Sequence, residues 1–172
     1  MAALVAVCSA VVSLAVPAAH SAHAAGLDQQ CAGSVDLRFS PGLTNTPQTV
    51  QVFYNSTVTC PVVAERRVAG GTGAGVFTIP GATCTNVTTV PNTVNYTWFP
   101  RAASSTVNYS ATSVNLQTVS QIVQTGSVSA GLLSGDQVHE VITLLNINLT
   151  ACNTSTGLTF ISGPEAIDFI SL

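Results

Sequence analysis

The sequence predicts an all-β fold, an antiparallel β-sandwich of about nine to ten strands, immunoglobulin-like or related, in a single domain after a signal peptide. Three observations lead to this prediction. Apolar and polar side chains alternate along many short segments, as half-buried strands require. Turn residues separate these segments at intervals of roughly 8 to 12 residues, which is typical of sandwiches. No segment after the leader shows the 3.6-residue period of an amphipathic helix.

The first 24 residues are predicted to be a signal peptide, because residues 3–16 are apolar and uncharged and Ala22-His23-Ala24 matches the small-residue preference of signal peptidase. The apolar run is too short to span a bilayer, which takes roughly 20 apolar residues. No Lys or Arg precedes it, so the usual positive n-region is missing. We therefore expect a secreted or cell-surface protein with one disulfide-bonded domain over residues 25–172 and no transmembrane segment in its mature chain.

The stretch ITLLNINLTAC, residues 142–152, is predicted to be the strand around which the sheet forms. Along an extended chain, one face carries Thr143, Leu145, Ile147 and Leu149, and the other carries Asn146, Asn148 and Thr150. Cys152 has the parity of the asparagines. Either a bulge near Ala151 redirects this cysteine inward, or the strand ends before it.

The remaining strands follow from the same alternation. They are expected at 31–39, 50–60, 62–68, 76–79, 83–90, 93–98, 106–111, 114–123, 158–161 and 167–169. The glycine-rich run 70–75 is expected to be a flexible connection, and residues 126–136 a turn-rich segment. Trp98 shares the apolar parity of its strand and is therefore predicted to lie in the core.

The charge balance makes nucleic acid an unexpected partner. The chain has four arginines, no lysine and seven acidic residues, for a net charge of −3. It therefore offers no basic patch to bind a phosphate backbone. The charge cluster Glu65-Arg66-Arg67 is expected at a strand edge, where charged side chains prevent edge-to-edge pairing.

Four cysteines remain after the leader, namely Cys31, Cys60, Cys84 and Cys152. An even count in an exported chain indicates two disulfides. Their separations of 29, 24 and 68 positions are far longer than the spacing of zinc ligands. Three pairings are possible, and we favour the nested one, in which Cys60 pairs with Cys84 and Cys31 with Cys152.

No catalytic, cofactor-binding or metal-binding residue is predicted. His139 is the one histidine after the leader, and no G-x-S-x-G motif accompanies it, so a Ser-His-acid hydrolase is not indicated. The spacing of the seven acids does not indicate the carboxylate pair of a glycosidase, although it leaves one open. The glycine-rich run lacks the Lys-Ser/Thr ending of a phosphate loop. Residues 134–136 lack the oxygen ligands of a calcium loop.

Several phrases resemble those of small exported actinobacterial proteins with a signal peptide and four cysteines. The phrases are FSPGLTNTPQTV at 39–50, GSVSAGLLSGD at 126–136 and ACNTSTGLTFISGP at 151–164, together with Cys60 and Cys84. The resemblance implies export and a β-rich architecture, and it implies no chemistry.

The leading functional hypothesis is a non-enzymatic secreted or cell-wall-associated protein that acts as a binding or structural module, with a cell-wall polymer or an extracellular protein as its partner. Three alternatives remain open. The protein is an extracellular protease inhibitor that presents a disulfide-anchored loop at 61–83, a small secreted hydrolase, or a pilin-like subunit with an incomplete sheet.

Overall fold

The computed structural model describes residues 26–61, 68–110, 112–116, 121–145 and 147–171. The predicted signal peptide, most of the predicted strand 62–68 and the cluster Glu65-Arg66-Arg67 lie outside these residues. Among the described residues, no helix has both the length and the apolar character needed to cross a membrane.

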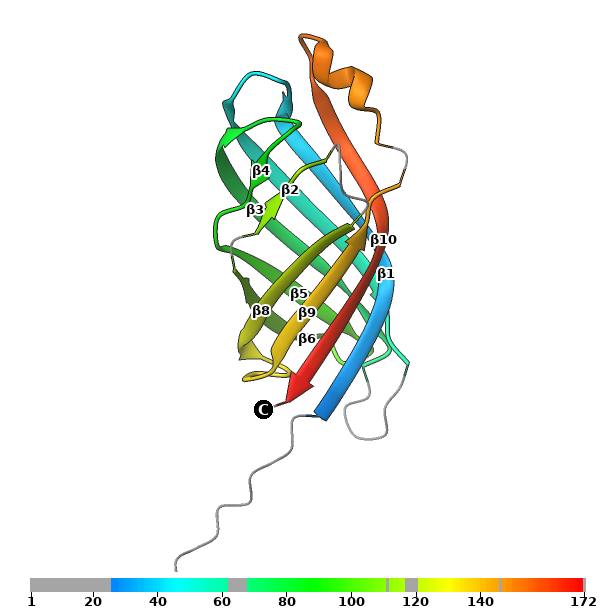
Figure 1. Cartoon of the computed structure of the whole chain (residues 1–172). Coiled ribbons are helices and arrows are strands. Elements are labelled where there is room, and N and C mark those ends of the chain that lie inside the picture. The colour runs from blue at the N-terminus through cyan, green and yellow to red at the C-terminus, as the bar shows by residue number, and fades with distance from the viewer. Residues whose placement is uncertain (1–25, 62–67, 111, 117–120, 146, 172) are drawn as a thin grey trace, which may run out of the picture.

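Within the described chain, eight strands form a closed antiparallel barrel in the order β1-β10-β9-β8-β6-β5-β3-β2 (Figure 1). Their bounds are Gly26–Leu43 for β1, Gln48–Thr59 for β2, Gly70–Ala82 for β3, Asn92–Phe99 for β5, Ala103–Tyr109 for β6, Gln121–Gly131 for β8, Gln137–Thr143 for β9 and Leu158–Ser171 for β10. The all-β, antiparallel prediction is confirmed. The strands close into one barrel, however, where two stacked sheets were predicted. The alternation of apolar and polar residues shows which face of a strand is buried, but the pattern is the same in a barrel and in a sandwich.

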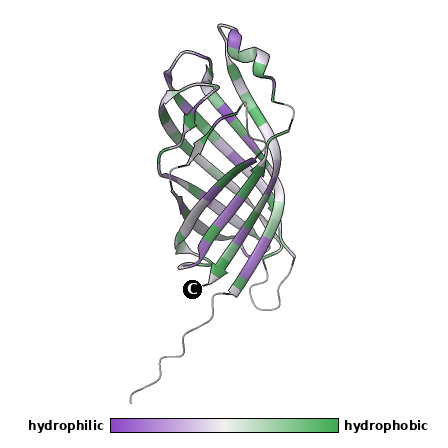
Figure 2. Cartoon of the chain, in the orientation of Figure 1, coloured by the Kyte–Doolittle hydropathy of each residue, from purple (hydrophilic) through white to green (hydrophobic). Residues whose placement is uncertain are grey.

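Apolar and polar residues alternate along the barrel wall, and Figure 2 shows this as bands of changing hydropathy along each strand. In β5, for example, Val94, Tyr96 and Trp98 are buried while the residues between them are exposed. The centre of the core is aromatic. The Trp98 ring stacks on Tyr96 with centroids 5.2 Å apart and meets the edge of Phe169 at 5.6 Å. The prediction that Trp98 lies in the core is confirmed.

The glycine-rich run 70–75 lies in strand β3 and is not the flexible connection that was predicted. Gly71 and Gly73 lie on the inner face of the wall, beneath two large rings. A Cβ atom on Gly71 would lie 2.5 Å from the Trp98 ring, and one on Gly73 would lie 2.6 Å from the Tyr96 ring. The run is glycine-rich because the aromatic side chains of β5 occupy the space that side chains of β3 would otherwise fill.

The prediction of a strand over residues 142–152 is correct only at its first two residues. Strand β9 ends at Thr143, and Leu149–Asn153 form a 3₁₀ helix, η1. Local hydrogen bonds favour the turn, since the Ala151 amide donates to the Asn148 carbonyl at 3.1 Å and the Thr154 hydroxyl to the Ala151 carbonyl at 2.7 Å. Of the two alternatives for Cys152, the one in which the strand ends before it is confirmed.

Two further predictions, the strand 114–123 and the turn-rich segment 126–136, also differ from the structure. Among its described residues, the expected strand 114–123 contains the end of the short strand β7 (Ser113–Val114) and the start of β8. The segment 126–136, expected to be rich in turns, belongs to β8 as far as Gly131, and its turn is confined to the residues that follow.

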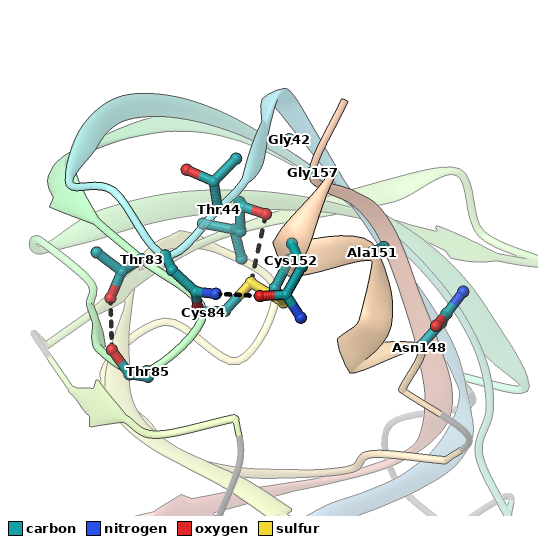
Figure 3. The surroundings of a disulfide bond; sticks show 12 residues. Gly42, Thr44, Thr83, Cys84, Thr85, Asn148, Ala151, Cys152 and Gly157 are labelled. Atoms are coloured by element: carbon teal, nitrogen blue, oxygen red, sulfur yellow. Dashed lines mark hydrogen bonds between the residues drawn. A yellow bond between two sulfur atoms is a disulfide. The ribbon is translucent and has the colours of Figure 1, made fainter. Parts of the chain in front are cut away.

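Two disulfides are present, as predicted, but the favoured pairing is wrong: Cys31 pairs with Cys60, and Cys84 pairs with Cys152. Cys31 and Cys60 lie on adjacent segments because β1 pairs with β2 up to Ala32 and Thr59, so their Cα atoms are 4.2 Å apart. The second disulfide joins the chain just after β3 to η1 (Figure 3). The favoured pairing was wrong because strand neighbours cannot be read from sequence spacing.

One end of the barrel is taller on one side than on the other. Four neighbouring strands, β10, β1, β2 and β3, extend beyond the strands that flank them, which are β9 beside β10 and β5 beside β3 (Figure 1). The pairing of β3 with β5 stops at Ala74 and Asn95, and that of β9 with β10 stops at Ile142 and Glu165. The upper halves of these four strands therefore form a concave wall. A separate two-stranded sheet of β4 (Val87–Thr88) and β7 lies against this wall.

A candidate ligand site in the barrel interior

A cavity of about 40 Å³ lies between the concave wall and the β4–β7 sheet. Its walls are almost entirely apolar. They comprise Leu37, Phe39, Val52, Phe77, Ile79, Val87, Val114, Ile122, Ile142 and Ile161, with Tyr54, Thr89, Asn92 and Gln124 as the polar members. The cavity is large enough for a few waters, since one water needs roughly 10–15 Å³ by this measure. Alternate inward-facing residues of the long strands create this apolar lining.

The covering sheet is small, and we call residues 87–89 and 112–114 the flap. Val87 pairs with Val114, and the Thr89 amide donates to the Thr112 carbonyl at 2.8 Å. Val87 and Val114 are buried against the cavity. Two-stranded sheets of this length are marginally stable in isolation, so the flap depends on its apolar contacts and on the Cys84–Cys152 tether nearby.

Polar groups gather below the cavity in what we call the Tyr–Glu cluster, comprising Tyr54, Ser56, Tyr96, Tyr109, Glu140 and Glu165. The Tyr54 hydroxyl, on the cavity wall, donates to Glu165 and lies 3.3 Å from Glu140 Oε1. The Ser56 hydroxyl also donates to Glu165. The phenol oxygens form a chain, with 3.0 Å from Tyr54 to Tyr96 and 3.3 Å from Tyr96 to Tyr109. Strands β2, β5, β6, β9 and β10 all contribute, so the cluster connects opposite sides of the barrel.

The two carboxyl groups lie in the barrel interior without a buried positive charge. Glu140 is 0% exposed and Glu165 is 3% exposed. No arginine, lysine or histidine is among the buried residues of the described chain. Burial, followed by the negative charge of Glu165, raises the pKa of Glu140 well above its usual range. Burial and the charge of Glu140 likewise raise the pKa of Tyr54, Tyr96 and Tyr109.

Two polar groups beside the cavity lack hydrogen bonds. Gln124 is 8% exposed and lines the cavity, and its amide, which is not fully enclosed, has no hydrogen bond to another residue in the described part of the chain. Oxygen Oε2 of Glu140 is also buried without a partner in that part. The two residues face each other across the β8–β9 ladder, which places their Cβ atoms about 5 Å apart. By contrast, the amide of Asn92 and the hydroxyl of Thr89 donate to backbone carbonyls.

The unpaired groups identify this region as a candidate binding site. A buried polar group left without a partner costs about 1–3 kcal/mol, and such groups are rare in folded proteins. A ligand that hydrogen-bonds to them recovers this free energy. The apolar wall beside them accommodates the rest of such a ligand.

The four cysteines, which are the site residues predicted from sequence, lie in disulfides outside this cavity. His139 is half-buried on β9 and is paired in the ladders with Thr125 and Asp168, on the face opposite Glu140. Among the described residues, no group of three or more His, Cys, Asp or Glu side chains is arranged to hold a metal. The loop 61–83 that was to serve a protease inhibitor contains β3 of the barrel wall.

Sequence reasoning did not identify Glu140 and Glu165 as a pair, although a signal was present. Glu140 lies between Val138 and Ile142 at the apolar parity of its strand, and Glu165 precedes Ile167 in the same way. An acid at a core position of a strand is unusual and marks a buried polar site. Comparison of the chain with protein-family models, with curated proteins and with solved structures finds no match.

Proposed function

We propose that the protein is a secreted, non-enzymatic binding protein that holds a small and mainly apolar ligand in the cavity beneath the flap. The observation that carries this proposal is a largely apolar cavity on whose wall the Gln124 side chain has no hydrogen bond to another described residue. Closed barrels of eight strands commonly hold one small ligand at this place in the fold. Export is supported by the predicted signal peptide, the resemblance to exported proteins and the two disulfides.

Binding is favoured over catalysis by the groups that line the cavity. The polar side chains on its wall are a phenol, two carboxamides and a threonine hydroxyl. The Tyr54 phenol hydrogen-bonds to Glu165, and the Thr89 hydroxyl to a backbone carbonyl. Both hydroxyls therefore hydrogen-bond to groups of the protein itself, and we take this as support for a binding role.

The size of the cavity limits the ligand. A cavity of about 150 Å³ accommodates benzene, and this one is about 40 Å³. A short chain of a few carbons fits after small movements of the lining side chains. A larger ligand requires displacement of the flap, which is held by two residue pairs and one nearby disulfide.

The test compares an inward and an outward substitution on β9. Ile142→Phe fills the cavity, whereas Val141→Phe adds the same bulk to the opposite face of the strand. We expect short-chain alcohols and amines to raise the melting temperature of the wild type and of Val141→Phe, since a ligand that binds only the folded state stabilises it. We expect no such shift for Ile142→Phe. The proposal is wrong if no compound shifts the wild type, or if both variants respond equally.

A further inference from the structure

We propose that the ligand is a small primary amine, whose ammonium group is held between Glu140 and Gln124 and whose alkyl part lies in the apolar cavity. This inference rests on the proposed function and names the chemical class of its ligand.

The first argument is charge. Two carboxyl groups lie side by side in the interior, and the buried part of the described chain contains no cationic side chain. An ionised carboxylate is strongly disfavoured in such an environment unless a cation accompanies it. An ammonium ion supplies the missing countercharge. A carboxylate ligand, in contrast, adds a third negative group and is repelled.

The second argument is hydrogen-bond complementarity. A primary ammonium group has three donors and no acceptor. The site offers Glu140 Oε2, which is buried without a partner among the described residues, and the amide oxygen of Gln124, its partner across the β8–β9 ladder. These two oxygens match two of the three donors of an ammonium group.

The third argument is the shape and polarity of the remaining space. Besides Tyr54 and Gln124, the cavity is lined mainly by apolar side chains, among them Val87 and Val114 of the flap. A short alkyl chain suits this lining. A quaternary ammonium ion does not suit the polar end, because it has no N–H group to donate.

Binding is expected to release a proton. Burial, followed by the charge of Glu165, raises the pKa of Glu140 and so favours its protonated form in the free protein. When an ammonium ion binds beside it, the carboxyl ionises and its proton passes to the buffer, so one cation enters as one proton leaves. The other groups packed around Glu140 are the phenols of Tyr54, Tyr96 and Tyr109, whose pKa values are raised, so they remain neutral. Affinity for the amine should therefore rise with pH as long as Glu140 is protonated in the free protein, by up to about tenfold per pH unit.

The experiment uses butylamine, butanol and butyrate, which share one alkyl chain and differ in the head group. Calorimetric titration of the folded, disulfide-bonded protein at pH 7, in two buffers of different ionisation enthalpy, measures affinity and proton release together. We expect butylamine to bind at least about tenfold more tightly than butanol, with release of up to one proton, and we expect no binding of butyrate.

Two variants assign the effect to the buried carboxyl. Glu140→Gln should lower butylamine affinity to that of butanol and abolish proton release, while butanol still binds. Asp168→Asn removes a carboxylate on β10 that hydrogen-bonds to the Gln30 side chain on the outer face of the barrel, and it should leave butylamine affinity unchanged.

Each outcome has a defined meaning. If butanol binds as tightly as butylamine, or if Glu140→Gln leaves butylamine affinity unchanged, the amine inference is overturned and the binding function stands. Binding of butyrate contradicts the charge argument directly. If none of the three compounds binds to the wild type, and longer amines and alcohols also fail, both proposals fall.

Discussion

Replacement of Gly73 by alanine should destabilise the barrel, because one methyl group on the inner face of β3 has no room. The added Cβ atom would lie 2.6 Å from Cε1 of Tyr96 and 3.0 Å from Cδ1 and Cζ of the same ring. Carbon atoms at optimal van der Waals separation are about 3.5–4.0 Å apart. Either the ring or the β3 backbone must therefore move.

The Tyr96 ring is held from several directions. It stacks on Trp98 at 5.2 Å, and its hydroxyl hydrogen-bonds to Tyr54 at 3.0 Å and to Tyr109 at 3.3 Å. A shift of even half an ångström disturbs the stacking and both hydrogen bonds. The β3 backbone is equally constrained, because β2 pairs with it on one side and β5 on the other.

These constraints set the size of the effect. Overpacking a well-filled core costs about 1–3 kcal/mol, and strain on the two phenol hydrogen bonds adds about 1 kcal/mol. Loss of glycine entropy in the unfolded chain returns about 0.4–1 kcal/mol. The net destabilisation is about 2 kcal/mol, which corresponds to a fall in melting temperature of roughly 4–8 °C for a domain of this size.

The assay is urea unfolding monitored by far-UV circular dichroism, with a thermal scan in parallel. Thr72→Ala is the matched control, because Thr72 is exposed on the same strand one position away. It should change the free energy of unfolding by less than about 0.5 kcal/mol. If Gly73→Ala is as stable as the wild type, the Tyr96 ring does not lie against β3, and the placement of the Tyr–Glu cluster is wrong.

Three further predictions concern stability. Opening the disulfide by Cys84→Ser with Cys152→Ser frees a loop of 68 residues and should cost about 4 kcal/mol in urea unfolding. Ser105→Ala removes the acceptor of the Trp98 indole N–H, a hydrogen bond of 2.8 Å, and should lower the free energy of unfolding by about 1–3 kcal/mol. The folded state holds the proton of Glu140 more tightly than the unfolded state, because burial raises the pKa of Glu140 above its unfolded value of about 4.3. The free energy of unfolding should therefore fall as the pH rises from the unfolded pKa toward the folded pKa, by up to about 1.4 kcal/mol per pH unit. Glu140→Gln should therefore flatten the decline in stability measured from pH 4.5 to pH 7.

The wall of the barrel was predictable wherever the side chains alternate without interruption. In β2, the alternation places Val50, Val52, Tyr54 and Val58 on one face, and all four are buried. A side chain in an extended chain must point to one side or the other, so alternation determines burial directly. Closure of the barrel was not predictable in this way, because it depends on which strands pair, and alternation carries no information about partners.

The errors near the end of the chain have a different cause. Residues 144–149 alternate well enough for a strand, yet the segment turns into η1 because its asparagines and threonines form local hydrogen bonds. The glycines of β3 were read as a loop because they carry no side chains to alternate. Their role became visible only with Tyr96 and Trp98 lying over them. Both errors occurred where a contact distant in sequence, or one within a turn, outweighs the local pattern.

The Tyr–Glu cluster is difficult to explain by stability alone. A buried polar network with an unpaired member is less stable than an apolar core of the same volume, and Glu140 Oε2 is such a member. Apolar residues at 140 and 165 would continue the pattern of Val138, Ile142 and Ile167 and give this small barrel a simpler interior. The acids therefore serve another purpose. The adjoining cavity, with Gln124 on its wall, supports the proposal that this purpose is recognition of a ligand.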